Sequence, residues 1–478
     1  MRKYLLISIL LLFAIPSFSQ KITLSAKEDL SFRNDDFMVV GKWKNYTTVY
    51  KNHASVGELL FYNQQMIKEK ISTLTFLPTT VSKIWFSASA THVSVFYVTK
   101  ESKVRNVFAS KMNEDLTWTE PVSLLRSSSG SYRNSGDFTF TTSEDRTKTL
   151  LSISSMEAGV SKIQATVVDE ELHTFTSLEQ TFTENEITIT DESLVMNNGK
   201  VFLVAADTRT SRGGADRLTL LSAFKGSTSF TSTIMPLNGY SVSDIHTLVD
   251  NTNGIVYISS YFSDSKYSTP RGLYFSGLNA EQLTLIGSYF TPLALQVSSS
   301  RKDLKDLKIR NIFLKKGGEL EIVAEKIYQN TRTVGGVAPL LSSSFMMSSM
   351  ADNTRTVNEF SYDEIVVFNL KTDGSLAWSQ VILKDQTTTD DNGIFSSYGV
   401  LRHRLGNAYI FSDMSGRQTR LLAAYISGNG EMTVKELQTS EEADEMSLMP
   451  RSAVQISSSE IVMPCVSKNY LCFLKISY

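Results

Sequence analysis

The chain of 478 residues is poor in the residues that interrupt or crosslink a fold. It contains 9 prolines, 25 glycines and two cysteines. No stretch rich in proline or glycine divides it, so we expect one large domain rather than several domains of about 150 residues each. Two cysteines exclude a disulfide-rich scaffold, because such scaffolds carry many cysteines in a short chain.

Long apolar runs and an excess of one charge are missing as well. Beyond the N-terminal segment, no uncharged apolar stretch is long enough to span a bilayer, so we expect no transmembrane segment. Lys and Arg number 47 against 49 Asp and Glu, which gives a formal net charge of −2. Basic runs are absent too, and we therefore expect no electrostatic capture of nucleic acid.

The sequence motifs of common active sites do not occur. There is no GxSxG, HExxH, Walker loop or dinucleotide fingerprint, and no His stands near a Cys at a metal-binding spacing. The histidines are isolated from one another, and we expect each to be a surface or packed residue: His53, His92, His173, His246 and His403. The sequence therefore predicts no cofactor and no metal site, and it assigns no catalytic residue.

The N-terminus is typical of a secretory signal. Arg2 and Lys3 precede an apolar core over 4–15, and Ser17 and Ser19 occupy the −3 and −1 positions of a cleavage site. We expect a signal peptide over 1–19 and a mature chain over 20–478 that is exported to the periplasm, the cell surface or the medium. Loss of the two basic residues leaves a side-chain charge of about −4.

Two hairpin-like stretches match each other closely. The segments 107–118 (VFASKMNEDLTW) and 367–378 (VFNLKTDGSLAW) share Val, Phe, Lys, an Asn or Asp, Leu and Trp at the same offsets. In the second, Asp373-Gly374 is a turn signal between two apolar runs. Weaker copies recur at intervals of about 50 residues, which indicates an internal repeat.

The strand pattern predicts the fold. Short runs of β-branched and aromatic residues, separated by Asn, Asp, Gly and Ser, recur along the chain, as in an all-β protein. A repeat holding about four strands has the length of a propeller blade. Seven internal hairpins and one composite blade predict a single β-propeller of eight four-stranded blades, with seven blades as the alternative. The composite blade joins an N-terminal strand at 21–24 to the last strands of the chain and so removes two exposed edges.

The two matching hairpins are similar to the Asp-box of sialidase-like propellers, with Asn113 and Asp373 at the Asp position. Lys111 and Lys371 stand where that motif has Ser, and even in that family the motif stabilises a turn. The resemblance implies a propeller and no hydrolytic activity. The whole chain resembles uncharacterised exported β-propeller-like proteins of Bacteroidetes, through the signal ending SFSQ, the stretch ELEIVAEKIY and the segment YDEIVVFNLKTDGSLAWSQVILKDQ. That resemblance implies an exported propeller and supplies no known activity.

One interval between hairpins is much longer than the others. Its segment 329–361 is rich in Ser, Thr, Gly and Met, and we expect a loop insertion within one blade. Met346, Met347 and Met350 are candidates for an adaptable contact surface, since methionine adapts to varied partners. The alternative is a flexible insertion without a binding role.

Two smaller features are candidate sites. Arg209, Arg212 and Arg217 surround Gly213-Gly214 and would suit a clamp on an anionic group, unless nearby Asp residues neutralise them. Cys465 and Cys472 face each other across a short predicted hairpin. Export would permit a disulfide between them, and the alternative is a pair of buried thiols.

Two functions are compatible with these observations. The sequence favours a monomeric, non-catalytic propeller that serves as a binding or scaffold module for a protein or a glycan. The alternative is a glycan-active hydrolase or lyase with carboxylates in the central channel. The second hypothesis predicts two or more carboxylates that converge on the axis of the ring, with an aromatic platform nearby.

Overall fold

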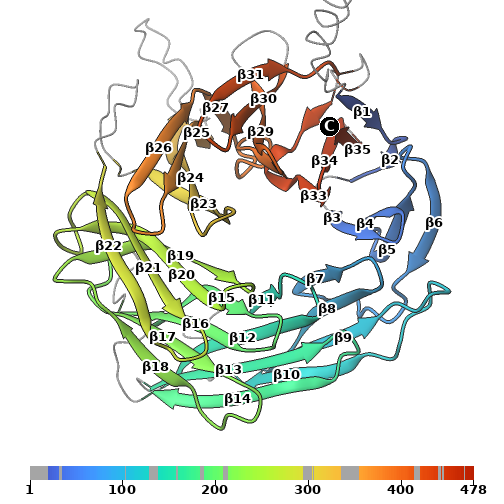
Figure 1. The fold of residues 1–478 in the computed structure, drawn as a ribbon. Helices are drawn as coiled ribbons and strands as arrows, with labels where there is room; N and C mark the ends of the chain where they lie inside the picture. Colours follow the sequence, from blue (N-terminus) through green and yellow to red (C-terminus); the bar gives the residue numbers. More distant parts are fainter. Residues whose placement is uncertain are drawn as a thin grey trace, which may run out of the picture.

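Alternating apolar and polar residues form antiparallel strands that pair mainly with their neighbours in sequence. The structure is a computed structural model. It describes residues 20–31, 35–102, 104–128, 138–157, 160–182, 188–207, 214–293, 304, 306–334, 355–413, 420–439, 443, 446–467 and 469–478. Eight separate sheets follow one another around a ring, which is the predicted eight-bladed β-propeller (Figure 1).

The blades are numbered here along the chain. Blade 1 contains β3 (Asp36–Trp43), β4 (Tyr46–His53), β5 (Val56–Tyr62) and β6 (Lys68–Thr73). Blade 2 contains β7 (Lys83–Ala88), β8 (Val93–Glu101), β9 (Val104–Lys111) and β10 (Val122–Ser128). Blade 3 contains β11 (Thr139–Thr142), β12 (Lys148–Glu157), β13 (Val160–Asp169) and β14 (Thr174–Phe182). Blade 4 contains β15 (Thr188–Val195), β16 (Val201–Ala206), β17 (Leu218–Ala223) and β18 (Thr231–Met235).

The remaining blades follow the same order. Blade 5 contains β19 (Ser241–Asp250), β20 (Ile255–Ser263), β21 (Gly272–Asn279) and β22 (Leu285–Pro292). Blade 6 contains β23 (Leu307–Leu314), β24 (Leu320–Val334), β25 (Arg355–Leu370) and β26 (Leu376–Ile382), and β27 (Gln386–Thr389) pairs with β25. Blade 7 contains β28 (Gly399–His403), β29 (Gly406–Asp413), β30 (Arg420–Ser427) and β31 (Met432–Glu436). Blade 8 contains β32 (Ser447–Leu448), the 3-10 turn η1 (Pro450–Ser452), β33 (Val454–Ser457), β34 (Glu460–Ser467), β35 (Tyr470–Ser477), β1 (Lys21–Leu24) and β2 (Glu28–Asp29).

The first strand of each blade lies nearest the axis and the fourth lies farthest from it (Figure 1). The turns that join strand one to strand two and strand three to strand four therefore lie on one face of the ring, which we call the turn face. The longer connections lie on the opposite face, which we call the loop face. Many of the turns are fixed by a side-chain oxygen, as where Asp373 Oδ1 accepts the backbone N–H of Ser375 at 2.9 Å.

Apolar side chains fill the space between neighbouring blades and close the ring. Eight buried clusters occur, and each joins one blade to the next, including blade 8 to blade 1. Phe368 packs between blades 5 and 6, and Trp378 packs partly buried between blades 6 and 7. The repeated hairpin thus supplies residues that pack between blades.

The predicted closure by the N-terminal strand is also confirmed. β1 pairs with β35 in antiparallel register, with Ile22 opposite Ile476 and Leu24 opposite Leu474. Ile22 and Leu24 pack against the cluster between blades 7 and 8. The last blade is thus built from both ends of the described chain, and the edge of β35 is covered.

The cysteines lie at the centre of blade 8. Cys465 and Cys472 are directly opposite each other on β34 and β35, both are fully buried, and they are not joined by a disulfide. The carbonyl of Pro464 accepts the backbone N–H of Met449. The carbonyl of Phe473 accepts the backbone N–H of Ser25, and the N–H of Phe473 donates to the Ser25 hydroxyl, so the backbone groups of both residues face away from the β34–β35 ladder. Hydrogen-bonded and non-hydrogen-bonded pairs alternate along an antiparallel ladder, so the next pair, Cys465 and Cys472, is a hydrogen-bonded one. Side chains in such a pair are farther apart than in a non-hydrogen-bonded pair.

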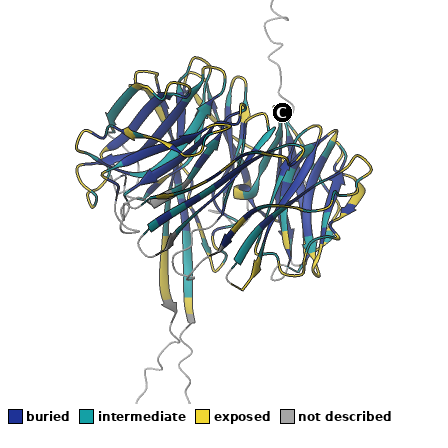
Figure 2. Ribbon diagram, turned by 90° about the horizontal axis from the view of Figure 1, so that it is seen from below, coloured by how far each residue is buried: buried dark blue, intermediate teal, exposed yellow. Residues whose placement is uncertain are grey.

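The prediction of a loop over 329–361 is wrong at both ends. β24 continues to Val334 and β25 begins at Arg355, and the two strands stay in register out to the pair Val334–Arg355. This two-stranded arm extends beyond the body of the ring (Figure 2). Polar Thr and Asn residues lie along the paired strands of the arm. The Ser- and Met-rich composition of the segment did not indicate this pairing.

Candidate functional site

Three neighbouring inner strands are interrupted at about the same depth in the ring. β15 shifts register between Ile189 and Ser193, β19 between Ser243 and His246, and β23 between Ile309 and Asn311. A β-bulge leaves a residue out of the ladder and re-aims its side chain, and bulges are common beside active sites. The residues within these three bulges include Glu192, Asp244 and Arg310.

His246 lies between the two carboxylates. Its Nδ1 is 3.4 Å from Glu192 Oε1, and its Nε2 is 3.4 Å from Asp244 Oδ1. The three side chains are 19–25 % exposed although each comes from an innermost strand. These innermost strands line the axis of the ring (Figure 1), although the Nε2 atom of His246 is itself buried. We call Glu192, Asp244, His246 and Arg310 the axial cluster.

Each carboxylate is held by the blade that follows it. Glu192 Oε2 accepts the backbone N–H and the hydroxyl of Thr247, both at 2.9 Å. Asp244 Oδ2 accepts the backbone N–H of Ile309 at 2.6 Å, and Asp244 itself has a left-handed φ of +54°. One oxygen of each carboxylate is therefore fixed, and the other is turned to the imidazole. A side chain held in this way keeps its position when a ligand arrives.

The charges around His246 favour its protonated form. Burial lowers the pKa of His246, but the contact with Asp244 and the charges of Glu192 and Asp244 outweigh burial, and the pKa is raised above 6.5. Arg310 acts against the protonated form because it is a nearby cation. The cluster thus holds a proton that is stabilised on an imidazole facing the channel.

Arg310 connects the axial cluster to a buried ionic network in blade 6. Its Nε lies 3.8 Å from Glu325 Oε2, and Glu325 is fully buried. Lys384 Nζ contacts Glu325 Oε1 at 2.8 Å, and Ser397 donates its hydroxyl to Glu325 at 2.6 Å. Burial lowers the pKa of Lys384, although Glu325 partly compensates. Glu325 therefore helps to hold the guanidinium of Arg310 near His246.

Two adjoining cavities lead from Arg310 to the turn face. The first, of about 240 Å³, is lined by Arg310, Tyr398 and Arg451 among others, and we call it the channel cavity. The second, of about 650 Å³, is lined by the first turns of blades 6, 7 and 8, and we call it the turn-face pocket. Phe313, Arg402 and Gln455 line both cavities, so the two lie side by side.

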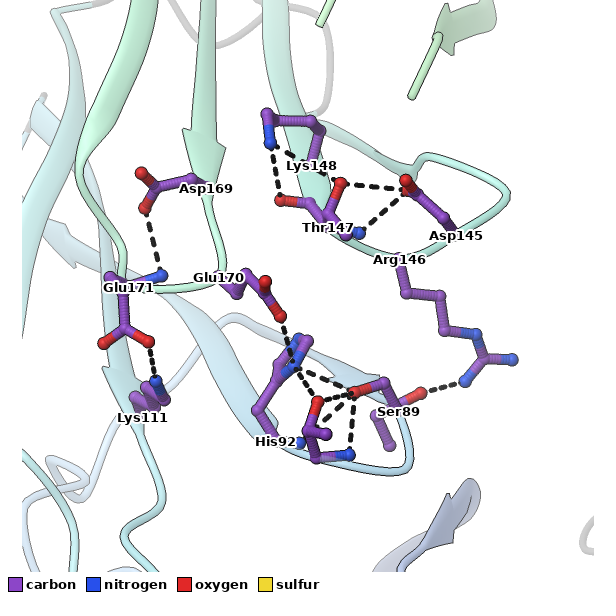
Figure 3. Close-up of polar contacts among 12 residues, drawn as sticks. Ser89, His92, Lys111, Asp145, Arg146, Thr147, Lys148, Asp169, Glu170 and Glu171 are labelled. Carbon is purple, nitrogen blue, oxygen red and sulfur yellow. Dashed lines mark hydrogen bonds and ion pairs between the residues drawn. The ribbon is translucent and has the colours of Figure 1, made fainter. Parts of the chain in front are cut away.

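Blades 2 and 3 form the opposite wall of the channel mouth. Arg146, Lys44 and Gln455 line a third cavity of about 300 Å³ on the turn face. Figure 3 shows Arg146 reaching from its turn towards the Ser89 turn of blade 2, where its guanidinium donates to the carbonyl of Ala88. Burial lowers the pKa of Arg146. Gln455 thus lies between the turn-face pocket and this cavity.

The histidine of this wall has a structural role. His92 is buried, and its Nδ1 contacts Glu170 at 3.0 Å and the hydroxyl of Ser89 at 2.8 Å (Figure 3). Burial lowers the pKa of His92 more than Glu170 raises it. Lys111 pairs with Glu171 beside it. These contacts join the turns of blades 2 and 3, as expected for a packed histidine.

Most of the residues predicted to bind a partner lie outside the described residues. These are Met346, Met347, Met350, Arg209 and Arg212. Arg217 is described and lies half-buried at the start of β17, where its backbone N–H donates to Asp207 at 3.0 Å. Asp207 and Asp216 pair with Lys266, at 3.1 and 3.4 Å. The predicted neutralising carboxylates thus have a lysine partner that the sequence did not indicate.

His246 is largely buried, as expected of a packed histidine, and the sequence did not indicate its two carboxylate neighbours. Asp244 and His246 are two residues apart in one strand, but a bulge lies between Ser243 and His246, so the usual alternation of side chains does not relate them. Glu192 occupies the corresponding strand of the preceding blade. An alignment of the inner strands would therefore have brought these residues together, whereas the outer hairpins used to count the blades carry no such signal.

Two further features of the described residues are relevant to function. Within them, no group of three or more His, Cys, Asp and Glu side chains is arranged to hold a metal ion. No helix in the described part of the chain is long and apolar enough to cross a membrane.

No family model matches the chain, and no curated protein matches it in sequence. Among solved structures, the chain is similar to a prolyl endopeptidase at 10% identity and a TM-score of 0.37, with 84% of this chain and 55% of that chain covered. It is similar to a polysaccharide lyase, Uly1, at 9% identity and a TM-score of 0.35, with 82% and 89% covered. It is also similar to an α-L-arabinanase of Penicillium chrysogenum at 11% identity and a TM-score of 0.34, with 64% and 92% covered. The proposals below rest on the site and not on these similarities.

Proposed function

We propose that the protein is a glycan-active hydrolase or lyase whose chemistry takes place in the central channel at the axial cluster. The observation that carries this proposal is His246, which is partly exposed and held between Glu192 and Asp244 on inner strands that line the axis (Figure 1). Two carboxylates near the axis were one condition that the sequence set for this function, and an aromatic platform beside them was the other. Ionisable clusters with shifted pKa values are frequent at catalytic sites.

The chemistry follows from the protonation of His246. Its contacts of 3.4 Å are longer than a normal hydrogen bond, so the imidazole is free to turn its proton to a bound oxygen. In a hydrolase, that proton passes to the glycosidic oxygen as the bond to carbon breaks, and a carboxylate of the cluster accepts a proton from the attacking water. In a lyase, the neutral imidazole removes the proton from the carbon that bears the sugar carboxylate, and Arg310 stabilises the negative charge that develops. A carbon–carbon double bond forms as the neighbouring bond to the glycosidic oxygen breaks, and the imidazolium returns its proton to the departing oxygen.

The second candidate is the non-catalytic binding module that the sequence favoured. The observation on its side is that Glu192 and Asp244 also fasten blade 4 to blade 5 and blade 5 to blade 6. The same contacts would serve a ring that only binds. The two candidates differ in whether the His246 imidazole is needed for turnover of a glycan.

The test is turnover of a panel of neutral and acidic polysaccharides by the full mature chain. New reducing ends report either reaction, and ultraviolet absorbance of an unsaturated sugar reports a lyase alone. We expect His246→Gln to lower the rate by about 100-fold or more, the usual contribution of a general acid or base. Glu192→Gln is expected to lower the rate and to shift the pH profile to lower pH, because one charge that stabilises the imidazolium is removed.

His173→Gln is the matched control, because His173 is 80 % exposed at a turn between outer strands. It should leave the rate unchanged. If His246→Gln turns over its substrate as fast as the unmodified chain, the axial cluster is not the catalytic site. If no glycan is turned over while one is bound, the binding module is the better description.

A further inference from the structure

The turn-face pocket carries an excess of positive charge. Lys316, Arg402 and Arg404 line it and are exposed, and its volume of about 650 Å³ is typical of a ligand site. Within the described residues, none of these three side chains forms an ion pair with a carboxylate. This is unusual in a chain whose formal net charge is −2.

The two carboxylates of the same pocket are already committed to its wall. Glu321 is buried and accepts hydrogen bonds from Asn407 and Tyr409, the latter at 2.5 Å. Glu319 accepts a hydrogen bond from Asn369 at 2.8 Å. Neither carboxylate forms an ion pair with the three exposed cations within the described residues.

Lys315 belongs to the wall as well. Its ammonium donates to Asn369 at 2.9 Å and to the carbonyl of Gly428 at 3.0 Å, and it lies 4.9 Å from the centre of the Trp378 ring. A cation–π contact of this kind fixes the ammonium in place. Arg402 is also held, because its guanidinium donates to the carbonyl of Leu314 at 3.3 Å and lies 4.9 Å from the centre of the Phe313 ring. Lys316, Arg402 and Arg404 remain the exposed cations of the pocket.

The opposite wall of the channel mouth gives an independent observation. Lys44 and Arg146 have left-handed φ values of +51° and +61° in the first turns of their blades. The first turns of blades 4, 5 and 6 place glycine in this conformation, at Gly199, Gly254 and Gly318. A residue with a Cβ atom is strained in this region, whereas glycine is not. Two blades therefore carry a strained basic residue at the channel mouth where glycine would be relaxed.

The carboxylates near Arg146 are also engaged. Asp145 accepts the backbone N–H and the hydroxyl of Thr147, both at 3.0 Å (Figure 3). Glu144 accepts a hydrogen bond from Asn251 at 2.9 Å. Arg146 itself donates to a backbone carbonyl, so its charge is available to an anionic ligand in the cavity.

We propose that the channel mouth on the turn face binds an acidic glycan, and that Lys316, Arg402 and Arg404 contact its carboxylate or sulfate groups. The choice of a glycan rests on the function proposed above. A sugar chain that enters here reaches Arg451 and Arg310 through the channel cavity. Arg310 is the member of the axial cluster that borders this cavity, and it lies near enough to His246 to act on its charge. Guanidinium groups suit this task because their planar donors match carboxylate and sulfate oxygens in pairs.

The experiment measures binding rather than turnover, in the His246→Gln background so that cleavage does not interfere. The probes are an oligogalacturonate, its fully methyl-esterified form, and dextran sulfate. We expect the first or the third to bind, the neutral ester to bind at least 10-fold more weakly, and the affinity to fall as salt is added. The probe that binds shows whether the recognised substituent is a carboxylate or a sulfate.

The double variant Lys316→Gln/Arg404→Gln should weaken binding of the acidic probe by at least 10-fold. The matched control is Lys21→Gln/Lys435→Gln, which removes the same charge from exposed positions on the outermost strands β1 and β31. The control should change the affinity by less than 2-fold, and both variants are exposed enough to leave the fold intact.

Three results would overturn the inference. They are equal binding of the charged and esterified oligomers, no binding of either acidic probe, and equal affinity of the double variant and the control. Failure of the proposed enzyme function is a separate outcome. Acidic glycans would then bind through these residues while the unmodified chain turns over no polysaccharide. Turnover of neutral glycans alone would leave the enzyme in place and refute the acidic substrate.

Discussion

Replacing Gly374 by alanine tests one contact between blades 5 and 6. Gly374 lies in the turn of the repeated hairpin with a φ of +78°. A Cβ atom added there would stand 2.3 Å from Cβ of Tyr289, which belongs to the outermost strand of blade 5. The Tyr289 Cβ atom is attached directly to the backbone, so relief requires one blade to move relative to the other.

The magnitude has two parts. A left-handed residue other than glycine costs about 1–2 kcal/mol, and an overpacked contact costs about 1–3 kcal/mol. Gly374→Ala should therefore destabilise the protein by about 2–5 kcal/mol. Gly226→Ala separates the two parts, because Gly226 has a φ of +85° and open space around its Cβ position. The control should cost only about 1–2 kcal/mol.

The assay is urea unfolding of the unmodified chain and both variants, followed by tryptophan fluorescence. Midpoints under one set of conditions are compared, because a chain of this size need not unfold in a single step. We expect the midpoint of Gly374→Ala to lie clearly below that of Gly226→Ala. If the two midpoints coincide, the hairpin does not press against blade 5 and the account of packing between blades is wrong.

Three further predictions concern buried polar groups. The pKa of His246 is raised on folding, so the stability that its protonation contributes is complete below the unfolded pKa and is lost as pH rises through the folded pKa. The difference in urea midpoint between the unmodified chain and His246→Gln should therefore shrink as pH rises through neutrality. Lys384→Met should cost about 3–5 kcal/mol, because Glu325 is left as a buried charge without its cation, and the added change Glu325→Gln should restore part of the loss in thermal unfolding. Cys465 and Cys472 should be unreactive to a thiol reagent in the folded protein, since burial and their mutual contact raise the pKa of Cys465. In urea the reagent should count two thiols per chain, and one or no titratable thiol would indicate a bond between the two cysteines.

The outer part of each blade was predictable because it is locally encoded. A turn residue such as Asp373 stands between two apolar runs, and this pattern specifies a hairpin without reference to the rest of the chain. The closure through β1 was predictable for a related reason. The last blade lacked one strand, and the segment 21–24 had no local partner. Both inferences need only the fact that a strand must be paired.

The axial cluster was not predictable in the same way because its members come from three blades. Glu192, Asp244 and Arg310 become neighbours only when the inner strands are placed side by side around the axis. Each reaches the channel through a bulge, and a bulge changes the alternation of side chains that sequence patterns rely on. The arm was misjudged for a different reason, since its strands carry Thr, Asn and Gln and lack the apolar alternation of a half-buried strand.

The pairing of β1 with β35 has a consequence for how the chain acquires its structure. Residues at opposite ends of the described chain, such as Ile22 and Ile476, become partners in one ladder. Contacts of such large sequence separation form late, because the entropy of closing the whole chain must be lost before they contribute. Until that step, the apolar faces of blades 1, 7 and 8 and the edge of β35 are open to other molecules. Pairing of the four-residue strand β1 is therefore expected to be a late step in folding of the ring. Weakening this strand should increase misassembly more than it changes the structure of the other blades.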